Sequence, residues 1–425
     1  MTTDTKLPLS GYTIADPKVQ ACPYPYYEAM RSDDPVHYDP ETDLWMIADY
    51  ELARTALKNW RVYSSVIDMR TDIAGPDMAE SDALFAEEGY IVPDVLSQVD
   101  PPQHTFFRSL VDRTFTGPVV RRMSDYLVDH AHEMIDVFID RGYCDFKEEF
   151  AVPLPLGVIA DQLGAPRSDM GKFRQWTDAI IETLGIMLSP QRRLECTRLI
   201  IEFQHYFVTR INEKKADPKE DILSQLVAAR HDDGRELTTE ELLALIQQLL
   251  TAGNETTRNH LVASIVMLIQ NPQQQALLRK DLTLVPKFVE ESLRLESPVQ
   301  GLFRVTKEDT ELGGKTIPKG SKVYVCYGSA NRDDKKFADA AHLNLNRGNA
   351  SQHMAFSYGI HRCIGQMLAR KELAIGLTAI LERMDNLQFG PEQGEIRHLP
   401  SFILRGIDGL KITFDKTTRE ASFGA

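Results

Sequence analysis

The residues best suited to chemistry lie in one string near the C-terminus, Phe356-Ser-Tyr-Gly-Ile-His-Arg-Cys-Ile-Gly365. Cys363 stands between two glycines and directly before an apolar, helical stretch. A cysteine at a helix start meets free backbone N–H groups and the positive end of the helix dipole, which favour the thiolate. Gly359 and Gly365 would let backbone or a flat cofactor approach closely. The string predicts a thiolate that binds a metal or attacks an electrophile; the alternative is a small buried thiol.

A second string, Ala252-Gly-Asn-Glu-Thr-Thr257, lies inside a long helical pattern. That pattern begins at Thr238, which forms a capping box with Glu241, and it stops at Asn271-Pro272. Glycine and threonine are poor helix formers, so a kink is one reading of the string. The other reading is functional, because an acid next to a hydroxyl is a minimal proton relay.

Helical periodicity indicates which side chains share the face of Thr256. Ala252 and Gln248 lie four and eight positions before it, and Thr251 lies five before it. We expect this face to line a pocket. Gln248 is unusual on an otherwise apolar stripe, and it either grips a polar group of a ligand or satisfies a backbone carbonyl.

Together these strings resemble the signature motifs of the cytochromes P450, the haem-thiolate monooxygenases. The pattern Phe-x-x-Gly-x-His-x-Cys-x-Gly matches at all its landmarks, and Ala/Gly-Gly-x-Asp/Glu-Thr-Thr/Ser matches throughout residues 252–257. Glu291 and Arg294 match the family's Glu-x-x-Arg, to which we assign a structural role only. The resemblance runs from about Asp16 to Phe414. It implies one domain over residues 1–425, mainly α with small β-sheets, with a strand-rich N-terminal lobe, a larger helical lobe and a long central helix over the haem.

The resemblance implies specific roles for the two strings. Cys363 would be the axial ligand of the iron of haem b, and Phe356 and Ala252 would contact the haem. Thr256 would hydrogen-bond the dioxygen that is activated, and Glu255 would relay protons to it. Haem propionates need cationic or donor partners when buried. The matching positions for these partners are His104, Arg108, Arg304 and His361.

The expected reaction inserts one oxygen atom of O2 into a mid-sized hydrophobic substrate, by hydroxylation or epoxidation, and the other atom leaves as water. The expected substrate is a terpenoid, a steroid or a substituted aromatic with a polar handle, because the pocket candidates are apolar with a few amides. Besides the 64–99 segment, these candidates are Gln248, Thr251, Ala252, Val299, Gln300, Phe402, Ile403 and Leu404.

Electrons are expected from outside the chain, since it contains no glycine-rich dinucleotide or flavin motif. An iron–sulfur ferredoxin fed by a ferredoxin reductase is the simplest source. In the family, the redox partner docks over the cysteine side. Candidate basic contacts for it are Arg113, Arg121, Arg122 and Arg362.

Composition narrows the partners and the compartment. The 425 residues carry 48 Lys and Arg against 62 Asp and Glu, a formal charge of 48 − 62 = −14, which argues against nucleic acid and anionic membranes as partners. Five scattered cysteines without a CxxC pair fit a reducing cytosol. The N-terminus shows neither a signal peptide nor a membrane anchor. We therefore expect a soluble, cytoplasmic protein of the bacterial type.

Three alternatives remain at this point. A haem-thiolate peroxygenase or isomerase would need no reductase, although the intact Glu255-Thr256 pair speaks against it. A non-catalytic haem sensor would leave that pair unexplained. A zinc protein is the weakest alternative, because His361-Arg-Cys363 is too closely spaced for a standard zinc site.

The remaining pattern predicts the elements around these strings. Residues 36–48 read as a hairpin, 49–59 as a short helix, and 64–99 as an irregular segment. The family resemblance implies that this segment covers the substrate pocket. Further predictions are helices over 125–139, 168–186, 190–214 and from Gly365 to about Met384, strands within 302–327, and a final hairpin over 402–414.

Overall fold

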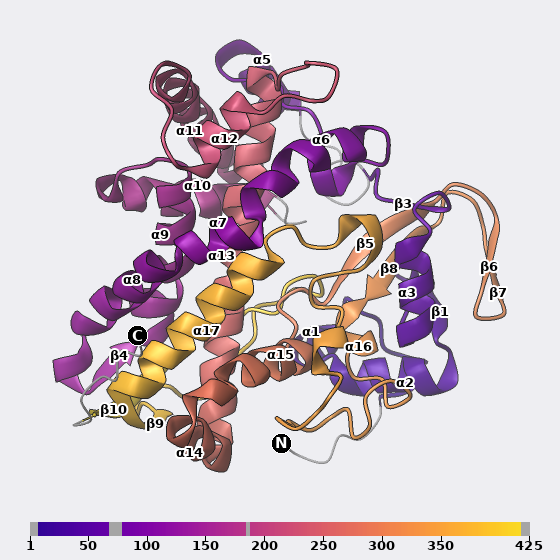
Figure 1. The fold of residues 1–425 in the computed structure, drawn as a ribbon. Coiled ribbons are helices and arrows are strands. Elements are labelled where there is room, and N and C mark those ends of the chain that lie inside the picture. Colours follow the sequence, from indigo (N-terminus) through magenta and orange to yellow (C-terminus); the bar gives the residue numbers. More distant parts are fainter. Residues whose placement is uncertain (1–6, 68–78, 184–187, 418–425) are drawn as a thin grey trace. The chain divides into compact units, whose positions relative to one another are not determined.

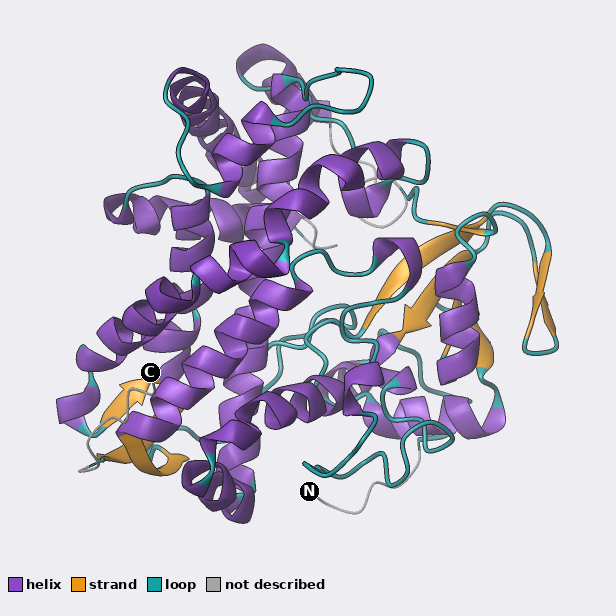
Figure 2. Cartoon of the chain, in the orientation of Figure 1, coloured by secondary structure: helices purple, strands orange, loops and turns teal. Residues whose placement is uncertain are grey.

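The computed structural model describes residues 7–67, 79–183 and 188–417. The chain is mainly helical with small sheets (Figure 2). It divides into two compact units. Unit 1 comprises residues 1–64, 120–154 and 256–425, and unit 2 comprises residues 65–119 and 155–255.

The helices are labelled in Figure 1. Those of unit 1 are α1 (Pro17–Ala21), α2 (Tyr24–Asp33), α3 (Tyr50–Lys58), α8 (Ser124–Asp136), α14 (Pro272–Lys280), α15 (Val285–Leu295), α16 (Tyr327–Ala330) and α17 (Gln366–Arg383). Those of unit 2 are α5 (Ala79–Glu88), α6 (Gln103–Val111), α10 (Met170–Thr183), α11 (Pro190–Ala216) and α12 (Ile222–Ala228). Three helices contain a boundary between the units: α7 (Gly117–Arg122), α9 (Pro153–Gln162) and α13 (Thr239–Gln270).

The strands all belong to unit 1 in the described part of the chain. They are β1 (Val36–Asp39), β2 (Leu44–Ile47), β3 (Tyr63–Ser64), β4 (Tyr143–Asp145), β5 (Gly301–Thr306), β6 (Thr310–Leu312), β7 (Lys315–Ile317), β8 (Lys322–Cys326), β9 (Met384–Phe389) and β10 (Lys411–Lys416). They form a five-stranded sheet in the order β1-β2-β8-β5-β3, a three-stranded sheet β4-β10-β9 and the hairpin β6-β7. In the larger sheet only the β2–β8 pair is parallel, with Trp45 opposite Val323.

The core of unit 1 joins the C-terminal half of α13 to α8, α15 and α17. Leu261, Ile265 and Leu268 of α13 are fully buried, as are Leu377 and Ile380 of α17. Their spacings of three and four residues place each set on one face of its helix. This apolar packing holds the helix that follows the cysteine string.

In unit 2 an aromatic cluster joins α10 to α11. Phe173 and Trp176 of α10 pack against Phe203 and Phe207 of α11, with ring centroids 5.7 Å apart for Phe173–Phe207 and 5.9 Å apart for Trp176–Phe203. All four side chains are fully buried. Aromatic burial on this scale stabilises a helix pair well beyond its intrinsic propensity.

Most of the predicted elements are present. The structure confirms the 36–48 hairpin, the helix after Asp49, and the strands within 302–327. It also confirms the two helices before and after the Ser189 N-cap, although residues 184–186 of the first prediction lie outside the described part. The capping box is also confirmed, since Thr238 N–H donates to Glu241 and Glu241 N–H donates to Thr238.

Two predictions about elements are wrong. Residues 79–88, inside the segment expected to be irregular, form α5; residues 68–78 lie outside the described part. The final hairpin does not form, because β10 pairs with β4 and β9 instead of with residues 402–407. Those residues make only two isolated bridges, Val299–Leu404 and His398–Ile407. Short apolar runs do not reveal their strand partner, which explains the second error.

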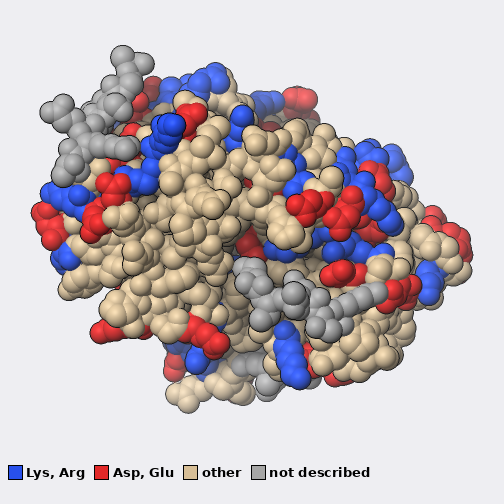
Figure 3. All heavy atoms as spheres, turned by 90° about the horizontal axis from the view of Figure 1, so that it is seen from below, with Lys and Arg blue, Asp and Glu red and all other residues tan. Residues whose placement is uncertain are grey.

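Charge is mixed on the face shown in Figure 3, where basic and acidic side chains lie interspersed. In the described part of the chain, no helix combines the length and the apolar character needed to span a bilayer.

Candidate active site

The cysteine string forms a tight loop that contains one 3-10 turn, η8 (Gly359–His361), and ends directly before the start of α17. The Cys363 N–H donates to the carbonyl of Phe356 at 2.9 Å, which closes the loop. Gly359 has φ +72°, and a Cβ there would lie 2.3 Å from the carbonyl oxygen of Leu57, at the end of α3. Glycine is therefore required at this position. The half-buried thiol precedes the α17 N-terminus, as the sequence predicts.

Ser357 also adopts a left-handed backbone, with φ +59°. Its hydroxyl lies 3.0 Å from that of the buried Tyr327. A residue with a Cβ is strained in this region, so the serine is held there by its surroundings.

The second string stays helical throughout α13, so its glycine and threonines do not end the helix. Ala252 and Gly253 are exposed in the middle of an otherwise buried helix, and nothing lies within 4 Å of a Cβ built on Gly253. Glu255 is 6% exposed and Thr256 is half-buried. Thr251 donates its hydroxyl to the Gln247 carbonyl at 2.9 Å, one turn back in the same helix.

Gln248 makes a contact within unit 2 that the sequence did not predict. Its Nε2 donates to the Ser97 hydroxyl at 2.6 Å, in the short turn η1 (Leu96–Gln98). The amide therefore binds a side chain rather than a backbone carbonyl. Because the Ser97 oxygen accepts this bond, its own O–H is oriented to donate elsewhere.

A buried acid on α17 contacts the last residue of the second string, Thr257, and was not predicted from the sequence. Glu372 is 4% exposed, and the hydroxyl of Thr257 on α13 hydrogen-bonds its carboxyl group. Burial raises the pKa of Glu372 to about 8, and the Thr257 bond lowers it by a smaller amount. The signal for this residue was its spacing, since Leu368 and Gly376, four positions on either side, mark the inward face of the helix.

The four predicted propionate partners occupy three elements. His104 and Arg108 lie on α6, where Arg108 pairs with Asp112 at 2.9 Å. His361 lies in η8. Arg304 of β5 is 5% exposed, and its guanidinium donates to the carbonyl of Phe303 at 2.6 Å. No carboxylate pairs with Arg304 among the residues that the structure describes, so it is a buried cation suited to an anionic ligand.

The predicted substrate contacts of unit 1 lie on two neighbouring segments. The Gln300 N–H donates to the Ile403 carbonyl at 2.8 Å, and Val299 bridges Leu404. Val299 and residues 402–404 are half-buried and can present apolar surface. Gln300 differs, because it is 2% exposed and its amide donates to the Ser297 carbonyl at 2.7 Å. Its burial favours a structural role over a substrate contact.

Glu291 and Arg294 form a fully buried ion pair with two hydrogen bonds of 2.8 Å. Arg294 also donates to the carbonyls of Asn331 and Ala340, at 2.9 and 2.6 Å. These contacts agree with the purely structural role predicted for the pair.

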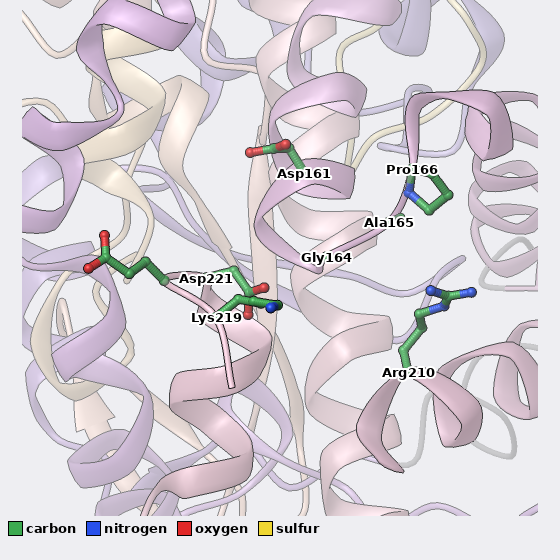
Figure 4. Close-up of a pocket in the computed structure, with 8 residues that line it drawn as sticks. Asp161, Gly164, Ala165, Pro166, Arg210, Lys219 and Asp221 are labelled. Carbon is green, nitrogen blue, oxygen red and sulfur yellow. The ribbon is translucent and has the colours of Figure 1, made fainter. Parts of the chain in front are cut away.

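A shallow surface pocket in unit 2 contains none of the predicted site residues (Figure 4). It is lined by Asp161, Gly164, Ala165, Pro166, Arg210, Lys219, Glu220 and Asp221. Its cations are neutralised by neighbours: Lys219 pairs with Asp217 at 2.5 Å and Arg210 with Glu213 at 2.8 Å. We therefore do not regard it as a candidate site. Within the described ranges, no three His, Cys, Asp or Glu side chains form a group that could hold a metal ion.

Comparison with known proteins gives one consistent family. Residues 168–413 match the family model described as Cytochrome P450. The cytochrome P450 monooxygenase PikC of Streptomyces venezuelae is 35% identical over 417 residues, which cover 94% of this chain and 93% of PikC. The structure of CYP109Q5 from Chondromyces apiculatus superposes with a TM-score of 0.84 at 32% identity, covering 96% of this chain and 98% of that one. CYP109E1 from Bacillus megaterium, solved in complex with corticosterone, gives 0.81 at 30% identity, with 93% and 99% covered.

Proposed function

Because the chain belongs to the cytochrome P450 family, we propose that it inserts one oxygen atom of O2 into a mid-sized hydrophobic substrate. The family consists of monooxygenases, and its members carry haem iron. The observation that carries the proposal is the complete thiolate loop around Cys363, together with Glu255 and Thr256 on α13. The second oxygen atom leaves as water, and the product is an alcohol or an epoxide.

The residues present fit a haem b group. Cys363 offers one thiolate, and Arg304 is a buried cation that a propionate would neutralise. His104, Arg108 and His361 are the further propionate donors that we propose. Thiolate-ligated haem supplies the O2 chemistry of this family, in which the ligand's electron density favours cleavage of the O–O bond. Phe356, in the cysteine loop, would pack against the haem ring. Ala252 would contact the same ring, because its small side chain permits a close approach.

Protons are handled by side chains of α13. We assign Thr256 as the hydroxyl that holds a proton at the reacting oxygen, and Glu255 as the acid that resupplies it. Glu255 is almost fully buried and directly precedes Thr256 on α13, which supports this pairing of roles. The substitution Thr256→Ala should lower the product formed per electron pair consumed. If activity came from hydrogen peroxide alone and survived that substitution, a peroxygenase would be favoured instead.

The substrate class follows from the mixture of apolar and amide side chains. Half-buried Val299 and residues 402–404 suit a hydrocarbon skeleton. The Gln248–Ser97 pair offers a hydroxyl donor for a carbonyl or hydroxyl of the substrate. A terpenoid, a steroid or a substituted aromatic meets both requirements. The complex of the similar CYP109E1 with corticosterone supports the steroid among these.

Electrons come from an external ferredoxin and its reductase, and the compartment we propose is the cytoplasm. No disulfide joins any two of the five cysteines, all of which lie in the described ranges, as expected in a reducing environment. Arg113, Arg121, Arg122 and Arg362 are exposed and form the proposed acidic-partner contacts. Reversing the charge of Arg362 or Arg113 should slow electron transfer and weaken its dependence on salt. Unchanged rates and salt dependence would refute this docking surface.

The deciding experiment is an optical titration of the purified ferric protein with terpenes, steroids and aromatics. A saturable shift of the haem band to the high-spin form with one class would identify the substrate type. The variant Gln248→Leu should weaken binding of ketone or alcohol ligands and leave a matched hydrocarbon unaffected. If neither group of ligands shifted the band, the proposed pocket would be wrong. The absence of any thiolate-haem spectrum would refute the function itself.

A further inference from the structure

A cluster of charged and aromatic side chains in unit 1 surrounds Phe356, the first residue of the cysteine loop. The position of Phe356 matters because its carbonyl accepts the Cys363 N–H at 2.9 Å. A displacement of Phe356 therefore moves the backbone of the sulfur-bearing residue.

Arg370 of α17 lies against the Phe356 ring, with its guanidinium carbon 4.3 Å from the ring centroid. Its Nε and Nη2 donate to the two carboxylate oxygens of Glu290 on α15, at 2.5 and 3.1 Å. Its Nη1 donates to Gln366 Oε1 at 3.1 Å. All three guanidinium nitrogens are thus engaged, which fixes the plane of the group against the ring.

His353 completes the cluster from the other side of Glu290. Its side chain is fully buried, and its Nε2 lies 3.4 Å from Glu290 Oε2. Its Nδ1 accepts the Ala355 N–H at 3.1 Å, so Nε2 carries the proton and faces the carboxylate. The imidazole and the Phe356 ring lie 5.6 Å apart at 41°. Glu290 is therefore the common anchor of the two groups that contact Phe356.

Glu290 is ionised at neutral pH. Its burial opposes ionisation, but hydrogen bonds from His353 and Arg370 outweigh this and hold its pKa at about 2. Glu290 and Arg370 thus contribute a balanced pair of opposite charges beside the loop.

We propose that Glu290, His353 and Arg370 form a clamp that positions Phe356 and, through it, the sulfur of Cys363. The clamp keeps the thiolate loop in one conformation and balances the charge next to it. These are positioning residues, and the inference rests on the proposed role of Cys363 as the haem ligand. Because the charges cancel in the intact clamp, removal of either partner alone changes the local field, with opposite signs for the two.

The test measures two properties of the haem-loaded protein. The first is the rate at which the carbon-monoxide complex converts from its thiolate form to its thiol form. The second is the reduction potential from a spectroelectrochemical titration. The variants are Arg370→Met, Glu290→Gln and the control Arg383→Met. Arg383 lies on the same helix, is 21% exposed against 26% for Arg370, and pairs with Asp136 at 2.7 Å.

In both clamp variants the carbon-monoxide complex should convert about fivefold faster than in the wild type. Arg370→Met removes the cation–π contact with Phe356, and Glu290→Gln weakens the charge-assisted hydrogen bonds that hold Arg370 against that ring. Arg370→Met leaves the carboxylate unbalanced, which should lower the potential. Glu290→Gln leaves the guanidinium unbalanced, which should raise it. The Arg383→Met variant should match the wild type in both properties. A merely structural role would not give shifts of opposite sign.

The proposal is overturned if the two clamp variants shift the potential in the same direction or not at all. It is also overturned if Arg383→Met converts as fast as Arg370→Met. Should Arg370→Met fail to load haem, Arg370→Lys keeps the charge but loses the two-pronged pairing. The Arg370→Lys variant should keep the wild-type reduction potential, while its carbon-monoxide complex should convert to the thiol form faster than that of the wild type. A conversion rate equal to that of the wild type would refute the clamp. If the wild type itself lacks a thiolate spectrum, the proposed function fails, and the inference fails with it.

Discussion

Replacement of Glu372 by glutamine should change how the stability of the protein depends on pH. Glu372 is buried, and its pKa is raised from 4.5 to about 8. In the unfolded chain the carboxyl ionises near pH 4.5, whereas in the folded protein it keeps its proton until about pH 8. The folded state therefore binds the extra proton between these values, and its stability falls as pH rises through that window. Below pH 4.5 this contribution is fully present, and above pH 8 it is lost.

The size of the effect follows from the two pKa values. Each pH unit inside the window costs the folded state up to ~1.4 kcal/mol, so the loss between pH 5 and pH 8 is about 3 kcal/mol. Glutamine has the shape of the protonated acid, can accept the Thr257 hydrogen bond, and does not titrate. We expect the free energy of unfolding of Glu372→Gln to be close to that of the wild type at pH 5 and higher by about 3 kcal/mol at pH 8.

The assay is urea unfolding followed by circular dichroism at pH 5, 6, 7 and 8. Glu382→Gln is the control, because Glu382 lies on the same helix and its pKa is raised by weaker burial. It should show a smaller pH-dependent gain. A difference between wild type and Glu372→Gln that stays constant from pH 5 to 8 would refute the reasoning, since it would mean that Glu372 does not titrate in this window.

Three further predictions concern the cysteine loop and the buried ion pair. Gly359→Ala should lower the stability of the folded protein by at least about 2 kcal/mol and reduce haem loading, because its Cβ would meet the Leu57 carbonyl. Thermal unfolding measures the stability, and the haem content of the purified variant measures the loading. A stable variant with a full complement of haem would contradict the contact. Ser357→Ala should lower the free energy of unfolding by about 1 kcal/mol, because the hydrogen bond with the Tyr327 hydroxyl is lost. Ser357→Gly should be more stable than Ser357→Ala, because glycine tolerates the φ of +59° at this position. Equal thermal unfolding midpoints for the two variants would argue against backbone strain. Glu291→Gln should cost about 3–5 kcal/mol by leaving Arg294 charged, buried and without its counter-ion, and a denaturation midpoint near the wild-type value would show that the pair is dispensable.

The sequence was sufficient to predict features that depend only on residues close together in the chain. Thr238 and Glu241 predict a helix start because a capping box needs only neighbouring residues. Gly359 was singled out for close backbone approach, and the Leu57 carbonyl is what approaches it. The strings around Cys363 and Thr256 were sufficient to indicate the family, because their residue types and spacing are dictated by the chemistry.

The sequence failed where the outcome depends on partners distant in the chain. The pairing of β10 with β4 and β9 was missed, because a strand's pattern shows its buried face but not its neighbour. Gln248 was expected to bind a polar group of a ligand or a backbone carbonyl, and the sequence did not indicate its contact with Ser97, which lies 151 residues away.

What the sequence alone determined is therefore the family, since its two signature strings are defined by the spacing of residues within about ten positions. Only the tertiary structure decided the environment of those strings. It buries Glu372, which raises the pKa of that carboxyl group, and it joins Glu290, His353 and Arg370 behind Phe356. Burial and counter-charge are properties of packed elements, and no local pattern along the chain specifies them.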